Sequence, residues 1–250
     1  MGYSLSNLTQ PVASPSHITL AGEGGMGKTT LAALMPKAVF IRTEDGMAAL
    51  NGQDVHAFPL ATSTTDVFEQ IGSLATVEHA FETLVIDSIT QFNTMAEQEI
   101  VKTDPKQPKS INQALGGYGA GHAAVSELHR QLRHWCGSLA SRKNMNIIYI
   151  AHTESESIDP PDSDGYTRYS LRLNKRSVSH YVDNVDCVGF IKLQTFVTGT
   201  GARIITCHPT PNHISKNRFG IKEDLAYPEG VNPLAPFIPT LTLIKGEKNV

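Results

Sequence analysis

The sequence predicts an α/β fold with a mostly parallel, twisted sheet that is flanked by helices. The first observation is a glycine-rich loop at 22–29, which lies between a short apolar strand and the start of a helix. The second is a set of continuous apolar runs at 38–41, 83–87 and 147–151, because strands buried on both faces have this composition. Segments of helical periodicity separate these runs, and alternating strands and helices are typical of a sheet that is covered on both faces.

Length and charge limit the organisation of the chain. With 250 residues, the chain can bury a full core, and one large domain fits this length better than two small ones. We expect an N-terminal arm at 1–16, the main domain at 17–225 and a proline-rich C-terminal segment at 226–250. The net charge of −3 gives no general attraction to nucleic acid, so nucleic-acid binding requires a local basic patch.

The cysteines and the apolar segments bear on the location of the protein. The three cysteines show no metal-binding or redox spacing, which favours reduced thiols in a cytoplasmic protein: Cys136, Cys187 and Cys207. The N-terminus lacks a signal-peptide pattern, and no apolar run approaches the length needed to span a membrane. We therefore expect a cytoplasmic protein with no membrane partner.

The glycine-rich loop fits the pattern G-x-x-x-x-G-K-[ST], in which backbone N–H groups and a helix N-terminus surround nucleotide phosphates. The residues expected to bind the nucleotide are consecutive: Gly22, Glu23, Gly24, Gly25, Met26, Gly27, Lys28, Thr29 and Thr30. Lys28 is expected to reach the β- and γ-phosphates, and the Thr29 hydroxyl to ligate Mg²⁺. The glycines alone also fit a dinucleotide fingerprint, but that motif has no use for the Lys28-Thr29 pair. A partitioning-type ATPase loop has a signature lysine at the position where this chain has Glu23. The absence of that lysine makes the partitioning family the weaker alternative without excluding it.

The ends of the three apolar runs carry polar side chains that suit phosphate chemistry. The first run leads to Glu44, which could orient and activate an attacking water; a solvated turn is the alternative. The second ends in Asp87, and in phosphate-loop enzymes an aspartate at this place holds Mg²⁺. The third ends at His152, where the polar groups of a parallel sheet would face the γ-phosphate.

Two helices and a long connection are predicted between these strands. Apolar spacing indicates a helix over 64–80, with Thr64 or Thr65 as its N-cap, and a long helix over 120–142. Trp135 lies on the apolar stripe of the long helix, and we expect it in the core. The connection that precedes the long helix has no apolar periodicity, and a loop of this length is usually functional or disordered.

The segment after His152 divides sharply by charge. Residues 154–164 contain five acidic residues and no base, whereas 165–181 contain four basic residues, three tyrosines and no acid. Basic residues among aromatics suit a surface for single-stranded nucleic acid, and a solvated hairpin edge is the equal alternative. If the basic half contacts DNA, we expect the acidic half to lie away from the DNA path.

Two more strands and a proline-rich end complete the chain. Apolar runs at 187–193 and 203–207 flank a glycine-containing turn at 198–201, and this pattern predicts a hairpin. Residues 227–239 contain four prolines and are expected to wrap the surface as irregular chain.

Together, these features resemble the RecA family of ATPases over about residues 17–222. The resemblance depends on the phosphate loop, the ends of the three apolar strands, and the glycine-rich segment Gly116–Gly119 before the long helix. Lys216-Asn217-Arg218-Phe219-Gly220 resembles the signature pentapeptide of the RadA branch. The compact size and the Tyr-x-Arg-Tyr-x-Leu stretch at 166–171 are similar to phage-encoded RecA-like proteins of the Sak group, which anneal single strands.

The resemblance implies a RecA-like P-loop NTPase core and assigns roles to individual residues. ATP and Mg²⁺ are the implied cofactors, with Glu44 activating water, Asp87 holding Mg²⁺ and His152 sensing the γ-phosphate. Lys216 and Arg218 would act in trans on the ATP of a neighbouring subunit, as an arginine finger does. The two DNA-contacting loops of the family fall at 103–119 and 153–176, and the residues expected to contact DNA are Lys109, Tyr118, Arg168, Tyr169, Arg172, Lys175 and Arg176.

The implied function is ATP- and Mg²⁺-dependent binding of single-stranded DNA in phage homologous recombination, by single-strand annealing in the cytoplasm of the bacterial host. The expected partners are single-stranded DNA and further copies of the chain in a ring or filament. A single-strand DNA-binding protein is a further candidate partner. Two alternatives stay open: a helicase-like or helicase-loader DNA motor, and a nucleotide switch of the partitioning type.

Overall fold

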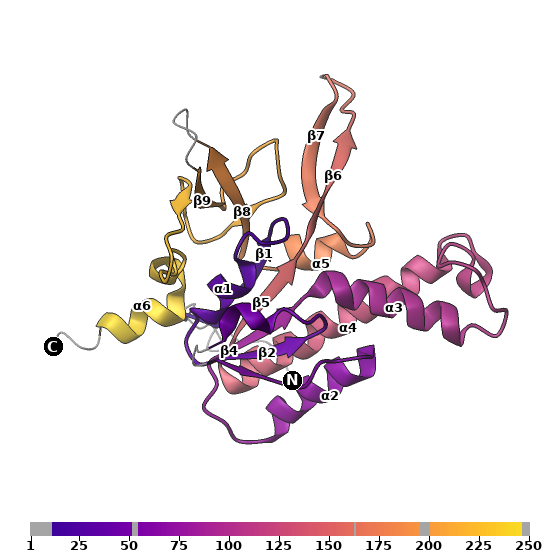
Figure 1. Cartoon of the computed structure of the whole chain (residues 1–250), viewed down its shortest axis with the longest axis horizontal. Helices are drawn as coiled ribbons and strands as arrows, with labels where there is room; N and C mark the ends of the chain where they lie inside the picture. Colours follow the sequence, from indigo (N-terminus) through magenta and orange to yellow (C-terminus); the bar gives the residue numbers. More distant parts are fainter. Residues whose placement is uncertain (1–11, 52–54, 163, 196–200, 247–250) are drawn as a thin grey trace, which may run out of the picture.

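The computed structural model describes residues 12–51, 55–162, 164–195 and 201–246, and it has the mixed α/β architecture that the sequence predicts (Figure 1). Its main sheet has nine strands in the order β11-β9-β8-β1-β5-β4-β2-β3, with β10 paired to β8. The strands of this sheet are β1 (His17–Ala21), β2 (Ala38–Arg42), β3 (His56–Ala57), β4 (Thr83–Asp87), β5 (Asn146–Ala151), β8 (Cys187–Thr195), β9 (Gly201–Thr206), β10 (Lys216–Asn217) and β11 (Leu225–Ala226).

Parallel pairing runs through the centre of the sheet, from β3 to β8. The antiparallel strands β9, β10 and β11 extend the sheet beyond β8. The register aligns Ala21 with Ala151, Ile150 with Asp87, and Asp87 with Arg42. The carboxyl ends of β1, β5, β4 and β2 therefore meet at one edge of the sheet, and the loops that follow them lie side by side. This edge is called the carboxyl edge below, and the opposite edge is called the amino edge.

Helices cover both faces of the sheet, as expected for parallel strands that are apolar throughout. They are α1 (Lys28–Ala33), α2 (Thr64–Thr76), α3 (Ile89–Thr103), α4 (Ala120–Lys143), α5 (Val178–Val182) and α6 (Pro239–Gly246), with short 3₁₀ helices η2 (Met47–Leu50), η3 (Ala114–Gly116) and η4 (Ala235–Phe237). In β5, Tyr149 points into the core shared with α2, α3 and α4, whereas Ile148 and Ile150 point toward α1 and the C-terminal segment. This alternation places one hydrophobic core on each face.

Two projections extend from this body (Figure 1). The first is an antiparallel ribbon of β6 (Thr153–Ile158) and β7 (Tyr166–Leu171), which begins directly after β5 and stands beside β8. The second is the connection between α3 and α4, which contains η3 and lies at the far end of these two helices. Both projections lie in the segments that the sequence marks as candidate DNA-contacting loops.

Several predicted boundaries need correction. The N-cap of α2 is Ser63, whose side chain accepts from the Asp66 N–H while Asp66 accepts from the Ser63 N–H, so neither Thr64 nor Thr65 caps the helix. The helix ends at Thr76, since the next residue is extended. The 198–200 part of the predicted turn lies outside the described residues, although β8 and β9 do pair as an antiparallel hairpin.

Trp135 and the C-terminal segment also differ from the prediction. The Trp135 side chain is 43% exposed and packs at the edge of the core, with its ring 6.0 Å from that of Phe68. A large indole is seldom fully buried, and Trp135 lines a cavity between α2 and α4. The segment 227–239 is not irregular throughout, because it contains η4 and ends where α6 begins, at Pro239, a favourable first helical residue. It also does more than wrap the surface, since Leu234 and Ile238 are buried in the core against α1.

Candidate active site

The glycine-rich loop after β1 adopts a conformation that depends on its glycines. Gly25 and Gly27 have φ angles of 75° and 89°, in the region that favours glycine. Gly27 also caps α1, and a Cβ at this position would lie 2.7 Å from a guanidinium nitrogen of Arg203. The loop therefore leaves the N-terminal N–H groups of α1 free to bind an anion.

Lys28 is buried and turned toward its own loop. Its ammonium donates to the carbonyl oxygens of Gly22, at 2.9 Å, and Glu23, at 2.7 Å. Burial lowers the pKa of Lys28, while the charges of Asp87 and Glu44 oppose this effect. The lysine is thus held by neutral carbonyl groups, which a phosphate oxygen can replace as a stronger, charge-assisted acceptor.

Thr29 and Asp87 form the second part of the site. The Thr29 hydroxyl donates to Asp87 Oδ2 at 2.8 Å across the gap between α1 and β4. Burial raises the pKa of Asp87 to about 6, against the opposing effects of the Thr29 hydrogen bond and the Lys28 charge. A hydroxyl and a carboxylate are hard oxygen ligands of the type that Mg²⁺ prefers.

The donor set fits Mg²⁺ bound together with phosphates. Among the residues that the structure describes, no cluster of three or more His, Cys, Asp or Glu side chains could hold a metal by itself. Magnesium usually takes only one or two protein ligands and completes its shell with phosphate oxygens and water. Thr29 and Asp87 would hold the ion, which when bound would neutralise charge that develops on the phosphates.

Glu44 and His152 meet across two strand ends. The Thr43 hydroxyl donates to the Ser88 carbonyl at 2.8 Å and accepts from the Ser88 N–H at 2.8 Å, which fixes the segment that carries Glu44 beside the end of β4. His152 Nε2 lies 3.2 Å from Glu44 Oε1, in a hydrogen bond that the imidazole donates. This hydrogen bond lowers the pKa of Glu44 despite partial burial, so the carboxylate is ionised and able to accept a proton at neutral pH.

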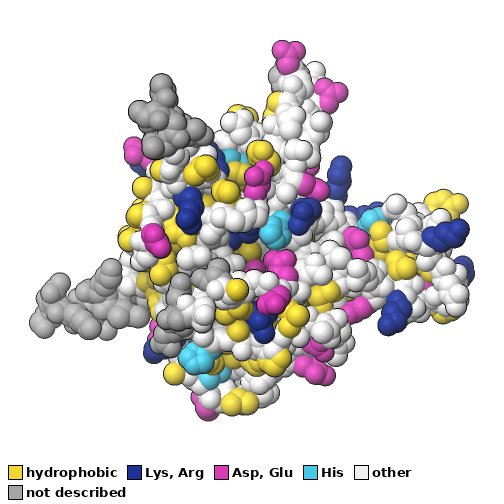
Figure 2. Space-filling view, viewed as in Figure 1, with side chains coloured by type: hydrophobic (Ala, Val, Ile, Leu, Met, Phe, Trp, Pro, Cys, Tyr) yellow, Lys and Arg dark blue, Asp and Glu magenta, His cyan; other side chains and the backbone are white. Residues whose placement is uncertain are grey.

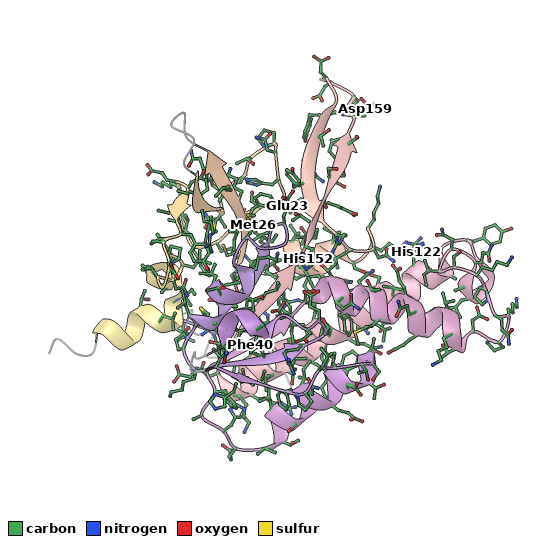
Figure 3. The ribbon with its side chains drawn as sticks, viewed as in Figure 1. Glu23, Met26, Phe40, His122, His152 and Asp159 are labelled. Atoms are coloured by element: carbon green, nitrogen blue, oxygen red, sulfur yellow. The ribbon has the colours of Figure 1, made fainter. Side chains whose placement is uncertain are left out.

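A cavity of about 240 Å³ joins these groups at the carboxyl edge. In Figure 3, His152 lies at the centre of the molecule, where the sheet, the phosphate loop and the ribbon meet. Four predicted catalytic residues line this cavity together with parts of the loop, and the complete lining is Gly25, Gly27, Lys28, Thr29, Thr30, Glu44, Gly46, Asp87, Ile150 and His152.

Sequence reasoning missed Tyr227, which holds the phosphate loop from outside, and Arg203, which lies beside the Tyr227 ring. The Tyr227 hydroxyl donates to the Gly27 carbonyl at 2.9 Å, and the Arg203 guanidinium lies 5.7 Å from the Tyr227 ring. Tyr227 is 200 positions away from Gly27 in the chain and belongs to the segment predicted to be irregular. No local pattern in the sequence indicates this contact.

Lys216 and Arg218 lie at the amino edge, away from the phosphate loop of their own chain. Asn217 pairs with Cys187, which in turn pairs with Ile18 at the start of β1. The Lys216 ammonium donates to the carbonyl of Asp183, and Arg218 forms an ion pair of 3.1 Å with Asp186. The role of these two residues in trans therefore stays a prediction.

The residues expected to contact DNA fall into separate groups. On the ribbon, Arg168 is paired with Glu156 at 2.6 Å, because the acidic strand β6 pairs with the basic strand β7. The acidic strand therefore lies directly beside the strand that carries Arg168. The expectation that the acidic half lies away from the DNA path stays a prediction. Tyr169 is 41% exposed, and its ring centroid lies 5.6 Å from that of Phe190.

The remaining predicted DNA residues are exposed at two places. Arg172, Lys175 and Arg176 follow β7 at the foot of the ribbon. Lys109 and the fully exposed Tyr118 lie in the connection between α3 and α4. Figure 2 shows basic side chains at the far end of this projection, where Lys106 and Lys109 are exposed in the connection and Lys102 is exposed in the last turn of α3.

The arrangement at the carboxyl edge identifies the class of protein. A buried lysine and a threonine at a helix N-terminus, opposite a strand-end aspartate, are the parts of a P-loop ATPase site. In agreement, the family model described as AAA domain, AAA_24, matches residues 14–219, and the chain belongs to this family. No curated protein matches the chain. No helix within the described ranges is long and apolar enough to cross a membrane.

Proposed function

We propose that the chain is a RecA-like, ATP- and Mg²⁺-dependent protein that binds single-stranded DNA and anneals strands in phage recombination. The observation that carries the DNA part is a cavity of about 690 Å³ between the β6–β7 ribbon and β8. Glu23 and Met26 of the phosphate loop line this cavity, and both are labelled in Figure 3. A ligand bound there touches the loop that binds ATP.

The chemistry of this cavity suits a single strand. The Tyr169 ring is tilted against that of Phe190, with centroids 5.6 Å apart, and Phe190 stacks on His213 at 4.5 Å. Phe190 and His213 are buried, whereas Tyr169 exposes part of its ring. Arg168 and Lys192 are the basic residues of the lining, where Arg168 is paired with Glu156 at 2.6 Å and Lys192 lies 3.9 Å from Asp224. Aromatic rings stack on bases without sequence preference, and cations follow the backbone phosphates, which is the behaviour that annealing requires.

The ATPase chemistry follows from the residues at the carboxyl edge. Lys28 exchanges its two carbonyl acceptors for oxygens of the β- and γ-phosphates, and Thr29 and Asp87 provide the magnesium ligands. Glu44 accepts the proton of the attacking water, and His152 holds that carboxylate in place and in its ionised form.

The ATPase part is tested by Lys28→Ala. We expect ATP turnover to fall by about 10²–10³-fold, because the terminal phosphates lose their main cationic partner in a site with little water. Lys37→Ala is the matched control, since Lys37 is an exposed lysine in a surface ion pair with Glu82 and should leave turnover unchanged. Turnover at the wild-type rate in Lys28→Ala would contradict the assignment.

The DNA part is tested by annealing of complementary labelled strands, with unwinding of a duplex as the parallel assay. Annealing without unwinding supports the proposal, and ATP-driven unwinding favours the helicase-like alternative. Nucleotide-dependent dimerisation without affinity for single strands favours the partitioning-type switch. The log–log salt slope of single-strand binding should fall by roughly 0.7 for each phosphate contact removed, so Lys175→Ala with Arg176→Ala shows whether the foot of the ribbon takes part.

A further inference from the structure

Arg172 lies where the ribbon returns to the carboxyl edge. It follows the last residue of β7, and its N–H donates to the His152 carbonyl at 2.9 Å. His152 is the residue between β5 and β6, so this hydrogen bond closes the foot of the ribbon next to the Glu44 partner. The backbone of Arg172 is thus fixed against a residue of the ATPase site.

The guanidinium of Arg172 has no hydrogen bond or ion pair with any residue that the structure describes. It nevertheless lines a cavity of about 290 Å³ with three carboxylates, Glu44, Glu97 and Glu154. Arg168, which lies four positions earlier on the same ribbon, is paired with Glu156 at 2.6 Å. The backbone of Arg172 is therefore fixed near the site, while its exposed guanidinium is not used to stabilise the ribbon.

This cavity and the phosphate cavity share Glu44. The positive charge of Arg172 also contributes to the lowered pKa of Lys28, which places the two cations within electrostatic reach of each other. Lys28 lines one of these cavities and Arg172 the other. Two cations in the cavities that share the catalytic carboxylate suit a ligand with several negative charges, such as the terminal phosphate of ATP.

We propose that Arg172 is a catalytic arginine that acts in cis and contacts the γ-phosphate during hydrolysis. In this reaction the water oxygen bonds to the γ-phosphorus, the bond from that phosphorus to the β–γ bridging oxygen breaks, and Glu44 takes the proton from water. The products are ADP and inorganic phosphate, and Glu44 then releases the proton to solvent. Arg172 donates hydrogen bonds to the equatorial oxygens, on which negative charge is spread in the transition state. This inference rests on the proposed ATPase function of the site.

The test compares Arg172→Ala and Arg172→Gln with the wild type. We expect kcat to fall by about 10²–10³-fold, with the affinity for a non-hydrolysable ATP analogue changed by no more than about threefold. Binding of ADP with aluminium fluoride, which mimics the transferring phosphoryl group, should be lost in both variants. Arg172→Lys should recover part of kcat, because it keeps the charge but not the fork of donors.

Three controls separate a catalytic arginine in cis from one that binds DNA or acts on a neighbouring subunit. Arg142→Ala removes an exposed arginine from the last turn of α4 and should leave kcat unchanged. Mixing Arg172→Ala with Lys28→Ala should restore no activity, since both residues would serve the same subunit. The salt slope of single-strand binding should stay at the wild-type value, which a DNA-contacting arginine would lower.

The proposal is overturned by a wild-type kcat in both Arg172→Ala and Arg172→Gln, or by rescue on mixing with Lys28→Ala. Equal losses of affinity for the ATP analogue and for ADP with aluminium fluoride would also overturn it, because the arginine would then serve binding and not the transition state. If Lys28→Ala also turns over ATP at the wild-type rate, the ATPase assignment itself fails, and this outcome is distinct from the other three.

Discussion

Arg218 at the amino edge of the central sheet and Lys28 and Asp87 at its carboxyl edge have different kinds of partner. At the amino edge, Arg218 is paired with Asp186 at 3.1 Å, and the same carboxylate accepts from the His17 N–H at 2.9 Å. At the carboxyl edge, Lys28 is held by two carbonyl groups and Asp87 by a hydroxyl, and neither forms an ion pair with a residue in the described part of the chain. Both edges are formed by the same strands, so the difference in partners arises from the loops and side chains at the two ends of these strands.

This difference separates structural charges from charges that serve a ligand. A charge that is buried without an opposite partner costs stability, and it is kept where a ligand provides the missing partner. The raised pKa of Asp87 and the lowered pKa of Lys28 are the signs of that cost at the carboxyl edge. At the amino edge, Arg218 and Lys216 already have partners within the chain, Asp186 and the Asp183 carbonyl. A catalytic role for them therefore requires the ATP of a second subunit.

The largest expected effect is a loss of ATP hydrolysis when Arg218 is replaced. This loss would contradict the contrast between the two edges, because it would give the amino edge a catalytic role. If Arg218 reaches the ATP of a neighbouring subunit, Arg218→Ala should lower hydrolysis by about 10³-fold or more while binding ATP normally. Asp186→Asn is the matched control, since it releases Arg218 from its ion pair and keeps an acceptor for His17. Steady-state turnover and analogue binding are measured at protein concentrations that allow assembly.

The trans assignment has its own test by mixing. Arg218→Ala combined with Lys28→Ala should regain part of the activity, because some interfaces then contain one intact site. The absence of rescue at any ratio, in mixtures shown to co-assemble, would make the Arg218–Asp186 pair purely structural.

The next effect concerns the carboxyl edge itself. Glu44→Gln should leave ATP binding intact and lower hydrolysis by about 10²–10⁴-fold, since the size of the side chain is kept and only the base is lost. Single-turnover hydrolysis and binding of a fluorescent ATP analogue measure the two quantities separately. A parallel loss of both would show that Glu44 supports the fold of the site instead of accepting a proton.

The central sheet was predictable because its physics is local to each strand. The runs at 38–41, 83–87 and 147–151 are apolar on both faces, and the structure places each of them in a parallel, fully covered strand. The site residues at their ends follow from the same reasoning, since strands that run parallel must end at one edge. Lys28, Glu44, Asp87 and His152 line one cavity for this reason.

Contacts between distant segments could not be predicted in this way. The acidic and basic halves of the ribbon look independent in the sequence, but antiparallel pairing sets Glu156 opposite Arg168. The contact of Tyr227 with the phosphate loop depends on how β9, β11 and the C-terminal segment fold back. The sequence shows that Trp135 lies on the apolar stripe of its helix. How much of its side chain is buried depends on the packing of α2 against that stripe, which the sequence does not show.

A smaller expected effect is a change in the pH dependence of stability, and it concerns His129, a buried residue of α4. His129 lies between the Tyr181 hydroxyl, at 2.8 Å, and Asn93 Oδ1, at 3.2 Å, and Asn93 also accepts from the Asn174 N–H two residues after Arg172. Complete burial lowers the pKa of His129 to about 3, so the imidazole is neutral in the folded state. The unfolded chain binds a proton near the ordinary value of 6.5, and the folded state does not.

The sign of the pH effect follows from this difference. Because the unfolded state takes up the proton first, stability is lost as the pH falls from 6.5 toward about 3. From pH 7 to pH 5 this one histidine should cost about 2 kcal/mol of unfolding free energy. His129→Gln should remove that part of the decline, and urea unfolding at the two pH values measures it. An identical pH dependence in the variant would show that His129 does not titrate differently in the two states.

The smallest effect tests whether the phosphate loop is held in shape before a ligand arrives. Tyr227→Phe keeps the buried ring beside Arg203 and removes only the hydroxyl that donates to the Gly27 carbonyl. That carbonyl still accepts from the Leu31 N–H at 2.9 Å, so we expect a loss of only about 0.5–1 kcal/mol in the unfolding free energy. ATP affinity should fall by about two- to fivefold, because a loop with fewer restraints must be ordered on binding. Tyr166→Phe on the exposed ribbon is the matched control and should change neither quantity. Unchanged stability and affinity in Tyr227→Phe would mean that the glycine conformations and the start of α1 fix the loop without help from the C-terminal segment.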